Sequence, residues 1–211
     1  MGSSQQTAVK TLLQRFGTTF VEQAEIPLKD TPSPLYRLLV LSTLLSARIS
    51  SDIAVAAAQE LSTAGFRTPE RMAESTWQQR VDALGRGHYR RFDESTATTL
   101  GEGAQLLLDE YQGDLRKLRD AADSTRQVSQ RLQDFPGIGP TGAAIFLREV
   151  QGIWPVVSPY FDKKAMEGAK RVGLPTEADR LAELVTMADR PRLAAGLVRV
   201  ALDKSDENPL G

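Results

Sequence analysis

Apolar residues recur at intervals of three and four along most of the chain, which is the spacing of one face of an α-helix. Residues 35–47 are rich in leucine, and their length favours a buried helix over a strand. With capping residues at the expected ends, the pattern predicts helices over residues 5–23, 35–47, 53–61, 68–73, 76–84, 93–111, 114–121, 124–132, 143–150, 160–172, 176–188 and 191–202. We therefore expect an all-α fold.

The segment Pro136-Gly137-Ile138-Gly139 separates two of these helices. Its two glycines allow positive φ and a tight turn, and Pro140 suits the first position of the helix that follows. Ile138 is expected to plug back between the two helices. Such a turn points free backbone N–H groups away from a helix N-terminus and makes an anion site. The same residues also fit an ordinary connection between two helices.

The chain has 211 residues, of which 41% are hydrophobic and 25% charged, enough for one or two compact units. Aromatic content is only 6% while alanine and leucine are abundant, which again favours helices. No apolar run is long enough to span a membrane and no secretory signal is visible. We expect a cytoplasmic monomer.

Cysteine is absent, which excludes disulfides and any thiolate-ligated zinc or iron–sulfur cluster. His88 is the only histidine, so a histidine-based catalytic network or metal cluster is excluded as well. We expect no cofactor. The formal net charge is −1, so DNA binding would have to depend on local basic clusters.

The run Phe135-Pro136-Gly137-Ile138-Gly139, followed by a helix of small residues, resembles the helix-hairpin-helix of the endonuclease III-like DNA glycosylases, the HhH-GPD superfamily. Leu44-Leu45-Ser46-Ala47-Arg48 resembles the family's Leu-Leu-Ser-Ala-Gln segment, and Gly113 stands where the family has an Asn-Gly helix end. Trp154-Pro155, leading into an apolar strand-like stretch, resembles the segment before the family's catalytic aspartate. The resemblance covers roughly residues 35–175.

The resemblance implies a two-lobed all-α fold with a DNA-binding cleft between the lobes. One lobe would be discontinuous, over residues 1–34 and 140–211, and the other would cover residues 35–139 and end in the hairpin, the two forming one compact unit. The implied partner is double-stranded DNA, with damaged and abasic duplexes included, and a bacterial protein would be nucleoid-associated. The residues implied to grip a phosphate, with a monovalent ion on the carbonyl side, are Pro136, Gly137, Ile138, Gly139 and Thr141.

The family removes damaged bases through a cationic sugar, which a nearby carboxylate stabilises, and its bifunctional members add a lysine that forms a Schiff base. Thr141 stands at the lysine position, so lyase activity is not expected and an active protein would be a monofunctional N-glycosylase. The family's aspartate also caps the helix after the Trp-Pro segment. The matching position is Ser158, which with Pro159 makes a good helix start but carries no carboxylate.

Asp162 is the nearest acid, about one helical turn beyond Ser158, and we consider it a displaced catalytic carboxylate. Its alternative role is to favour the helix dipole from the first turn. Lys163 and Lys164 are either phosphate contacts or solvated side chains.

Arg48 replaces the glutamine that helps the family fill the hole left by a flipped base, and it is able to stack and donate hydrogen bonds there. A basic loop carries Arg86, His88, Arg90 and Arg91 and suits phosphate contacts, with Tyr89 as a candidate wedge. The alternative for each is a solvated surface residue. We expect Trp77 and Trp154 in the core, and Asp134 and Glu149 in solvent.

Three functions are compatible with these observations. The first is a DNA-repair glycosylase with altered catalytic residues, and the second is a non-catalytic module that binds DNA structure or damage. The third is a helical protein–protein module in which the hairpin is accidental.

Overall fold

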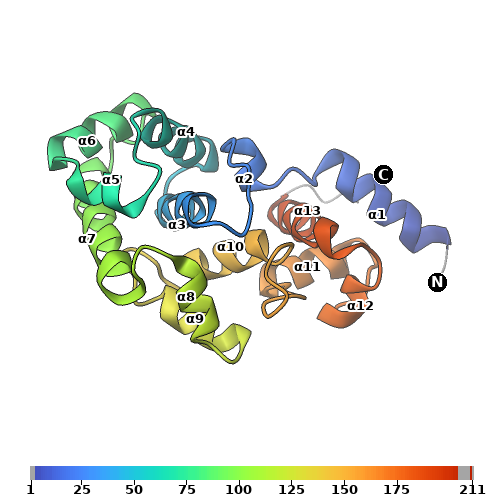
Figure 1. Cartoon of the computed structure of the whole chain (residues 1–211). Coiled ribbons are helices and arrows are strands. Elements are labelled where there is room, and N and C mark those ends of the chain that lie inside the picture. Colours follow the sequence, from blue (N-terminus) through green and yellow to red (C-terminus); the bar gives the residue numbers. More distant parts are fainter. Residues whose placement is uncertain (1–2, 204–209, 211) are drawn as a thin grey trace. The chain divides into compact units, whose positions relative to one another are not determined.

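The computed structural model describes residues 3–203 and residue 210, and all regular structure within them is helical (Figure 1). This confirms the all-α prediction. Contacts between residues divide the chain into two compact units, which we describe separately. The terminal unit consists of Met1–Phe20 and Leu147–Gly211, and the hairpin unit consists of Val21–Phe146. The lobe boundaries expected after residues 34 and 139 stay a prediction.

The hairpin unit is built from helices of very different lengths. They are α3 (Pro32–Ser46), α4 (Ser51–Thr63), α5 (Pro69–Glu74), α6 (Trp77–Arg86), α7 (Asp93–Tyr111), α8 (Leu115–Asp120), α9 (Thr125–Leu132) and the first part of α10 (Pro140–Val150). The short helix α2 (Phe20–Gln23) begins at the boundary with the terminal unit, and α10 continues into that unit.

Helix α3 is the centre of the hairpin unit and packs against α4, α7 and α8. Its residues Leu35, Leu38, Leu41 and Leu44, spaced three apart, are completely buried. Burial of a leucine side chain contributes about 1.5–3 kcal/mol each. The leucine-rich stretch is therefore a buried helix, as its length and composition predict.

Side-chain caps define where several helices of the hairpin unit begin. The side chains of Ser50, Thr68 and Ser124 each accept a hydrogen bond from a backbone N–H in the first turn of the helix that follows. Thr76 and Gln79 form a reciprocal capping box at the start of α6. These starts follow from local sequence and lie within two residues of the predicted ones.

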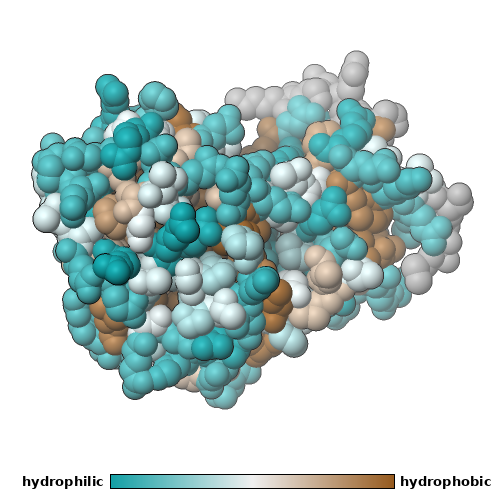
Figure 2. Space-filling view, turned by 45° about the horizontal axis from the view of Figure 1, so that its top comes forward, coloured by the Kyte–Doolittle hydropathy of each residue, from teal (hydrophilic) through white to brown (hydrophobic). Residues whose placement is uncertain are grey.

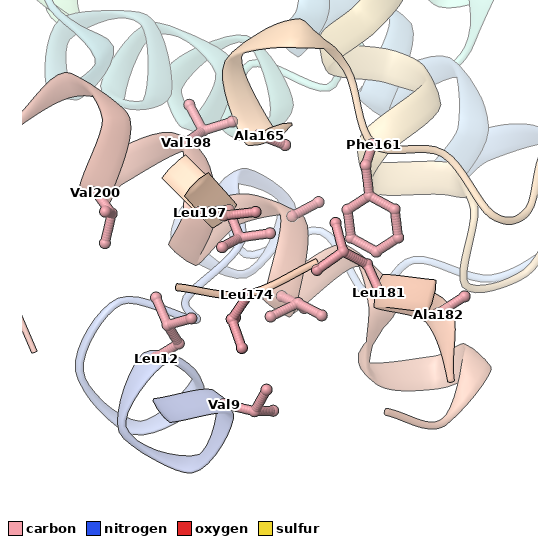
Figure 3. Close-up of a cluster of buried hydrophobic side chains, with 13 residues drawn as sticks. Val9, Leu12, Phe161, Ala165, Leu174, Leu181, Ala182, Leu197, Val198 and Val200 are labelled. Atoms are coloured by element: carbon pink, nitrogen blue, oxygen red, sulfur yellow. The ribbon is translucent and has the colours of Figure 1, made fainter. Parts of the chain in front are cut away.

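The terminal unit contains α1 (Ser3–Arg15), α11 (Lys163–Arg171), α12 (Ala178–Ala182), the short 3₁₀ helix η1 (Met187–Asp189) and α13 (Arg190–Leu202). Helix α13 packs against both α1 and α11. Its approach to α11 depends on Gly168, where an added Cβ would lie 1.9 Å from the Leu197 carbonyl oxygen. Figure 3 shows the buried core of this unit, with Phe161 and Ala165 among its members.

Several predicted elements of the terminal unit are wrong in detail. The helix expected over 5–23 ends at Arg15, and a Cβ on Gly17 would lie only 2.5 Å from the Leu13 carbonyl oxygen. The helix expected over 160–172 begins at Lys163, and the strand-like stretch after Pro155 is a pair of turns. The helix expected over 176–188 is replaced by α12 and η1.

The surface seen in Figure 2 is mostly hydrophilic, and its hydrophobic areas are interrupted by polar residues. Among the residues that the structure describes, no helix combines the length and the hydropathy that crossing a membrane requires.

Candidate functional site

The segment between α9 and α10 forms a tight turn. The Ile138 N–H donates to the Phe135 carbonyl at 3.1 Å, and Gly137 has a φ of +79°. Ile138 and Phe135 are 4% and 2% exposed, and the Phe135 ring stacks on Tyr111 with the ring centroids 6.2 Å apart. The turn is therefore anchored by two inward-pointing apolar side chains. Of its two glycines only Gly137 has positive φ.

The turn leaves backbone donors at the start of α10. Pro140 is the first residue of this helix and has no N–H. The N–H groups of Gly139, Thr141 and Gly142 have no hydrogen-bond acceptor among the described residues. Gly139 and Thr141 are exposed, and the positive end of the helix dipole lies here. This arrangement is suited to holding an anion such as a phosphate.

Gly142 brings the end of α3 against the start of α10. A Cβ on Gly142 would lie 2.2 Å from Ser46 Oγ and 3.4 Å from the Ser42 carbonyl oxygen. Two residues beyond Ser46, Arg48 is exposed in the bend that follows α3. Arg48 therefore follows directly on the end of α3 that packs against the start of α10.

The basic loop is fixed to the same end of α3 by Tyr89. This side chain is completely buried, and its hydroxyl lies 3.5 Å from the Leu44 carbonyl oxygen. Burial also raises the pKa of the Tyr89 phenol. The prediction of Tyr89 as a wedge is therefore wrong, because the ring is a core residue. Gly87 allows the loop to approach α4, since a Cβ there would lie 2.5 Å from the Ala57 Cα.

The basic residues of the loop differ in their surroundings. His88, which has a φ of +62°, is exposed, as are Arg90 and Arg91. Arg91 lies over the Phe92 ring, at 5.1 Å from its centroid. Arg86 is the last residue of α6 and pairs with Glu60 at 2.9 Å. His88, Arg90 and Arg91 are thus more available to a ligand than Arg86.

The terminal unit contains the acid that the sequence singled out. Asp162 is the N-cap of α11, and its Oδ1 accepts from the Ala165 N–H at 2.9 Å. The prediction that Ser158 caps this helix is wrong, because the helix begins at Lys163 and not at residue 160. Ser158 Oγ instead lies 2.7 Å from an Arg190 Nη1 that donates to it. Phe161 and Ala165, on either side of the cap, are buried in the core (Figure 3).

Asp162 also forms an ion pair with the end of α10. Its Oδ2 lies 2.9 Å from Arg148 Nη1, and the two side chains are only 17% and 10% exposed. Gln151, directly after the end of α10, accepts from the Tyr160 N–H through its amide oxygen at 2.9 Å and donates to the Tyr160 carbonyl through its amide nitrogen at 2.8 Å. Burial, reinforced by the charge of Asp162, raises the pKa of Tyr160. The segment that carries Asp162 is thus held by Arg148 of α10 and by Gln151, the residue that follows α10.

Sequence reasoning missed these polar residues at the end of α10. Glu149, expected in solvent, is 4% exposed, and its Oε1 accepts from the Phe20 N–H at 3.2 Å. The one feature of the sequence that could have indicated buried polar residues is the position of Arg148, Glu149 and Gln151 at the end of an apolar helix. The prediction that Trp77 lies in the core is also wrong, because this residue is 40% exposed. Trp154 is buried, as predicted.

The two lysines that follow Asp162 differ in whether they form an ion pair. Lys163 is exposed at the first position of α11, whereas Lys164 pairs with Glu167 in the same helix. Lys163 is therefore the more available to an anionic ligand.

No protein-family model and no curated protein matches the chain. Among solved structures, it is similar to a non-covalent complex of endonuclease III with DNA at a TM-score of 0.51 and 14% identity, covering 94% of this chain and 85% of that one. A trapped covalent intermediate of endonuclease III with DNA, an estranged-adenine complex, has a TM-score of 0.48 at the same identity and coverage. The first of these similarities establishes the architecture: the chain has the helical fold of endonuclease III.

Proposed function

We propose that this protein binds double-stranded DNA through the hairpin unit and acts in base-excision repair as an endonuclease III-like protein. The observation that carries this proposal is the hairpin itself, whose turn exposes N–H groups at the start of α10 without an acceptor in the described protein. A DNA phosphate is the anion that such a site would take. The endonuclease III structure that shares the fold is a complex with DNA, which supports the same partner.

The charges around the hairpin support DNA as the ligand. Arg48 follows the end of α3 that packs against α10, and the loop with His88, Arg90 and Arg91 is anchored to that same end through Tyr89. Phosphate contacts of this kind set position and affinity, and they work in a chain without net positive charge because they are local.

Asp162 is the proposed carboxylate for base removal. The family's aspartate caps the helix after the Trp-Pro segment, and in this chain Asp162 caps the helix that follows Trp154-Pro155. In this proposal the carboxylate is at position 162 and not at position 158, because the helix starts later than expected. A carboxylate there would stabilise the cationic sugar as the glycosidic bond breaks. Without a lysine at position 141, water would complete the reaction and the strand would stay intact.

A non-catalytic DNA-binding function is the second candidate, and the Arg148–Asp162 ion pair favours it. The guanidinium lies 2.9 Å from the carboxylate and offsets the negative charge that the chemistry requires. Such a protein would hold damaged or abasic DNA without releasing a base.

Fluorescence anisotropy with abasic and undamaged duplexes over a range of salt concentrations tests DNA binding. We expect affinity to fall as salt rises, and we expect Arg48→Gln and Arg90→Gln each to weaken binding and lower the salt slope by about 1. Arg180→Gln is the matched control, because Arg180 is an exposed arginine of α12 in the terminal unit. Absence of binding at low salt, or equal effects of all three variants, would contradict the proposal.

Catalysis is tested by incubation with a panel of damaged-base duplexes, followed by alkali to reveal abasic sites. If the unmodified protein releases a base, Asp162→Asn should abolish the release and leave DNA affinity nearly intact, because asparagine keeps the volume and the capping oxygen. Base release that survives this change would exclude the role given to Asp162. Binding without release on every duplex would favour the second candidate.

A further inference from the structure

We propose that Arg148 is an electrostatic brake on Asp162. Its guanidinium would hold the carboxylate in an ion pair and so reduce the negative charge available to a positively charged sugar. This inference rests on the proposed function, in which a DNA sugar approaches Asp162. With this brake in place, the chain would keep a carboxylate at the helix cap and bind DNA with little base release.

The two carboxylate oxygens of Asp162 have different partners. Oδ1 is held by the Ala165 N–H at 2.9 Å, and both Phe161 and Ala165 are buried in the core of the terminal unit. The Ala165 N–H therefore holds Oδ1 independently of Arg148. The bond from Arg148 Nη1 to Oδ2, at 2.9 Å, therefore adds mainly a positive charge.

That charge acts strongly because the pair is sheltered from water. The Arg148 side chain is 10% exposed and the Asp162 side chain 17%, so solvent screens the interaction less than at an open surface. Asp162 is the acid that pairs with Arg148 among the described residues. The positive end of the α11 dipole and the exposed Lys163 add further positive charge at the start of this helix. The ion pair of Asp162 with Arg148 therefore carries no net charge.

The consequence for the chemistry follows from the charge of the transition state. When the bond from C1′ to the base nitrogen breaks, the electron pair leaves with the base, which takes a proton, and the sugar becomes a cation. Water then adds its oxygen to C1′ and loses a proton, so that one water molecule is consumed. An unpaired carboxylate would stabilise this cation, and a guanidinium beside the carboxylate would oppose it.

The test uses two duplexes that differ only in the charge at one sugar. One carries a pyrrolidine abasic analogue, which is cationic like the transition state, and the other carries a neutral tetrahydrofuran abasic analogue. The measured quantity is the ratio of the two affinities for the full chain at fixed salt. It needs no knowledge of the natural lesion, because neither duplex contains a base at that position.

We expect the unmodified protein to bind the two duplexes with similar affinity. Arg148→Gln removes the charge but keeps a polar side chain, and it should raise the preference for the cationic duplex by about tenfold. Arg148→Lys keeps the charge and should resemble the unmodified protein. Asp162→Asn combined with Arg148→Gln should lose the preference again, because the carboxylate is gone.

An unchanged ratio in a folded Arg148→Gln protein, while both duplexes still bind, would overturn the brake and leave the proposed function intact. A protein that binds neither duplex would overturn the proposed function and this inference with it. If Arg148→Gln fails to fold, Asp162→Asn alone decides the matter. It leaves the guanidinium without its partner, so the cationic duplex should then bind more weakly than the neutral one, and a ratio that does not fall would refute the inference.

Discussion

Gly142 of α10 and Ser46 of α3 approach so closely that a Cβ on Gly142 would lie 2.2 Å from Ser46 Oγ. This contact sets the distance between the two helices at the start of α10, where the free amides of the hairpin lie. It also explains why a glycine is needed inside a helix, where it costs about 0.5–1 kcal/mol relative to alanine. A glycine at position 142 therefore allows the close packing of α3 on α10 next to the candidate phosphate site.

We expect Gly142→Ala to lower the free energy of unfolding by about 1–3 kcal/mol, because the added methyl group overpacks the contact with α3. Gly103→Ala in α7 is the matched control, since an added Cβ there meets nothing within 4 Å. It should stabilise the protein by up to about 1 kcal/mol through helix propensity. Urea denaturation measures both changes, and equal effects at the two positions would show that the Gly142 contact is unimportant.

The two glycines of the hairpin should respond differently to substitution. Gly137 has positive φ, and a Cβ there would lie 2.6 Å from Thr99 Cγ2, whereas a Cβ on Gly139 meets nothing within 4 Å. Gly137→Val should therefore distort the turn and weaken duplex binding at fixed salt, at a cost in stability of about 1–2 kcal/mol or more. Gly139→Ala should leave the fold intact. Unchanged DNA affinity in a folded Gly137→Val protein would remove the hairpin from the binding site.

Borohydride trapping on an abasic duplex should give little covalent adduct, because Thr141 cannot form a Schiff base with the sugar. Thr141 is exposed, so a lysine is accommodated there without burying a charge. Thr141→Lys should then raise the trapped fraction well above that of the unmodified protein. Thr98→Lys, at an exposed position of α7 in the same unit, controls for the added charge. Strong trapping by the unmodified protein would instead implicate another lysine, such as Lys163 or Lys164.

Stability at low pH should depend on Asp114. Its carboxylate caps α8 and pairs with Arg116 at 2.7 Å, and the hydrogen bond from Arg116 lowers its pKa below the ordinary value. A carboxylate whose pKa is depressed by folding contributes stability above its unfolded pKa, near 4, and this contribution is lost as the pH falls through the folded pKa.

The difference in unfolding free energy between the unmodified protein and Asp114→Asn should therefore shrink below about pH 4. At pH 7 it should be within about 1 kcal/mol, because the pair is near the surface and asparagine is also a good cap. Chemical denaturation at both pH values measures it. A constant difference down to pH 2 would show that the Arg116 pair does not stabilise the folded state.

Much of the fold could be predicted because it depends on local rules. The caps at Ser50, Thr68, Thr76 and Ser124 are read from the residues on either side of each helix start, and the structure has them. The buried leucines of α3 follow from their spacing, and the hairpin turn follows from Pro136 and Gly137. These features need only neighbours within about one helical turn.

The residues around Asp162 could not be predicted in the same way. Ser158-Pro159 and Asp162 are both suitable helix starts by local rules, and the choice between them depends on which residues enter the core. Phe161 and Ala165 are buried, and this burial places Asp162 at the cap. The contact from Arg148 joins residues 14 apart in the sequence and the contact from Gln151 joins residues 9 apart, and no local pattern records either.

The sequence by itself determined the helical class, the hairpin and the absence of a lysine at position 141, because residue identity and short-range spacing decide each of them. Only the tertiary structure decided that Tyr89 is a core residue, that Glu149 is buried against Phe20, and that Asp162 rather than Ser158 begins α11. The physical reason is the same in all three cases. A side chain's role depends on the face of the protein on which packing places it, and packing joins residues that are distant in the sequence.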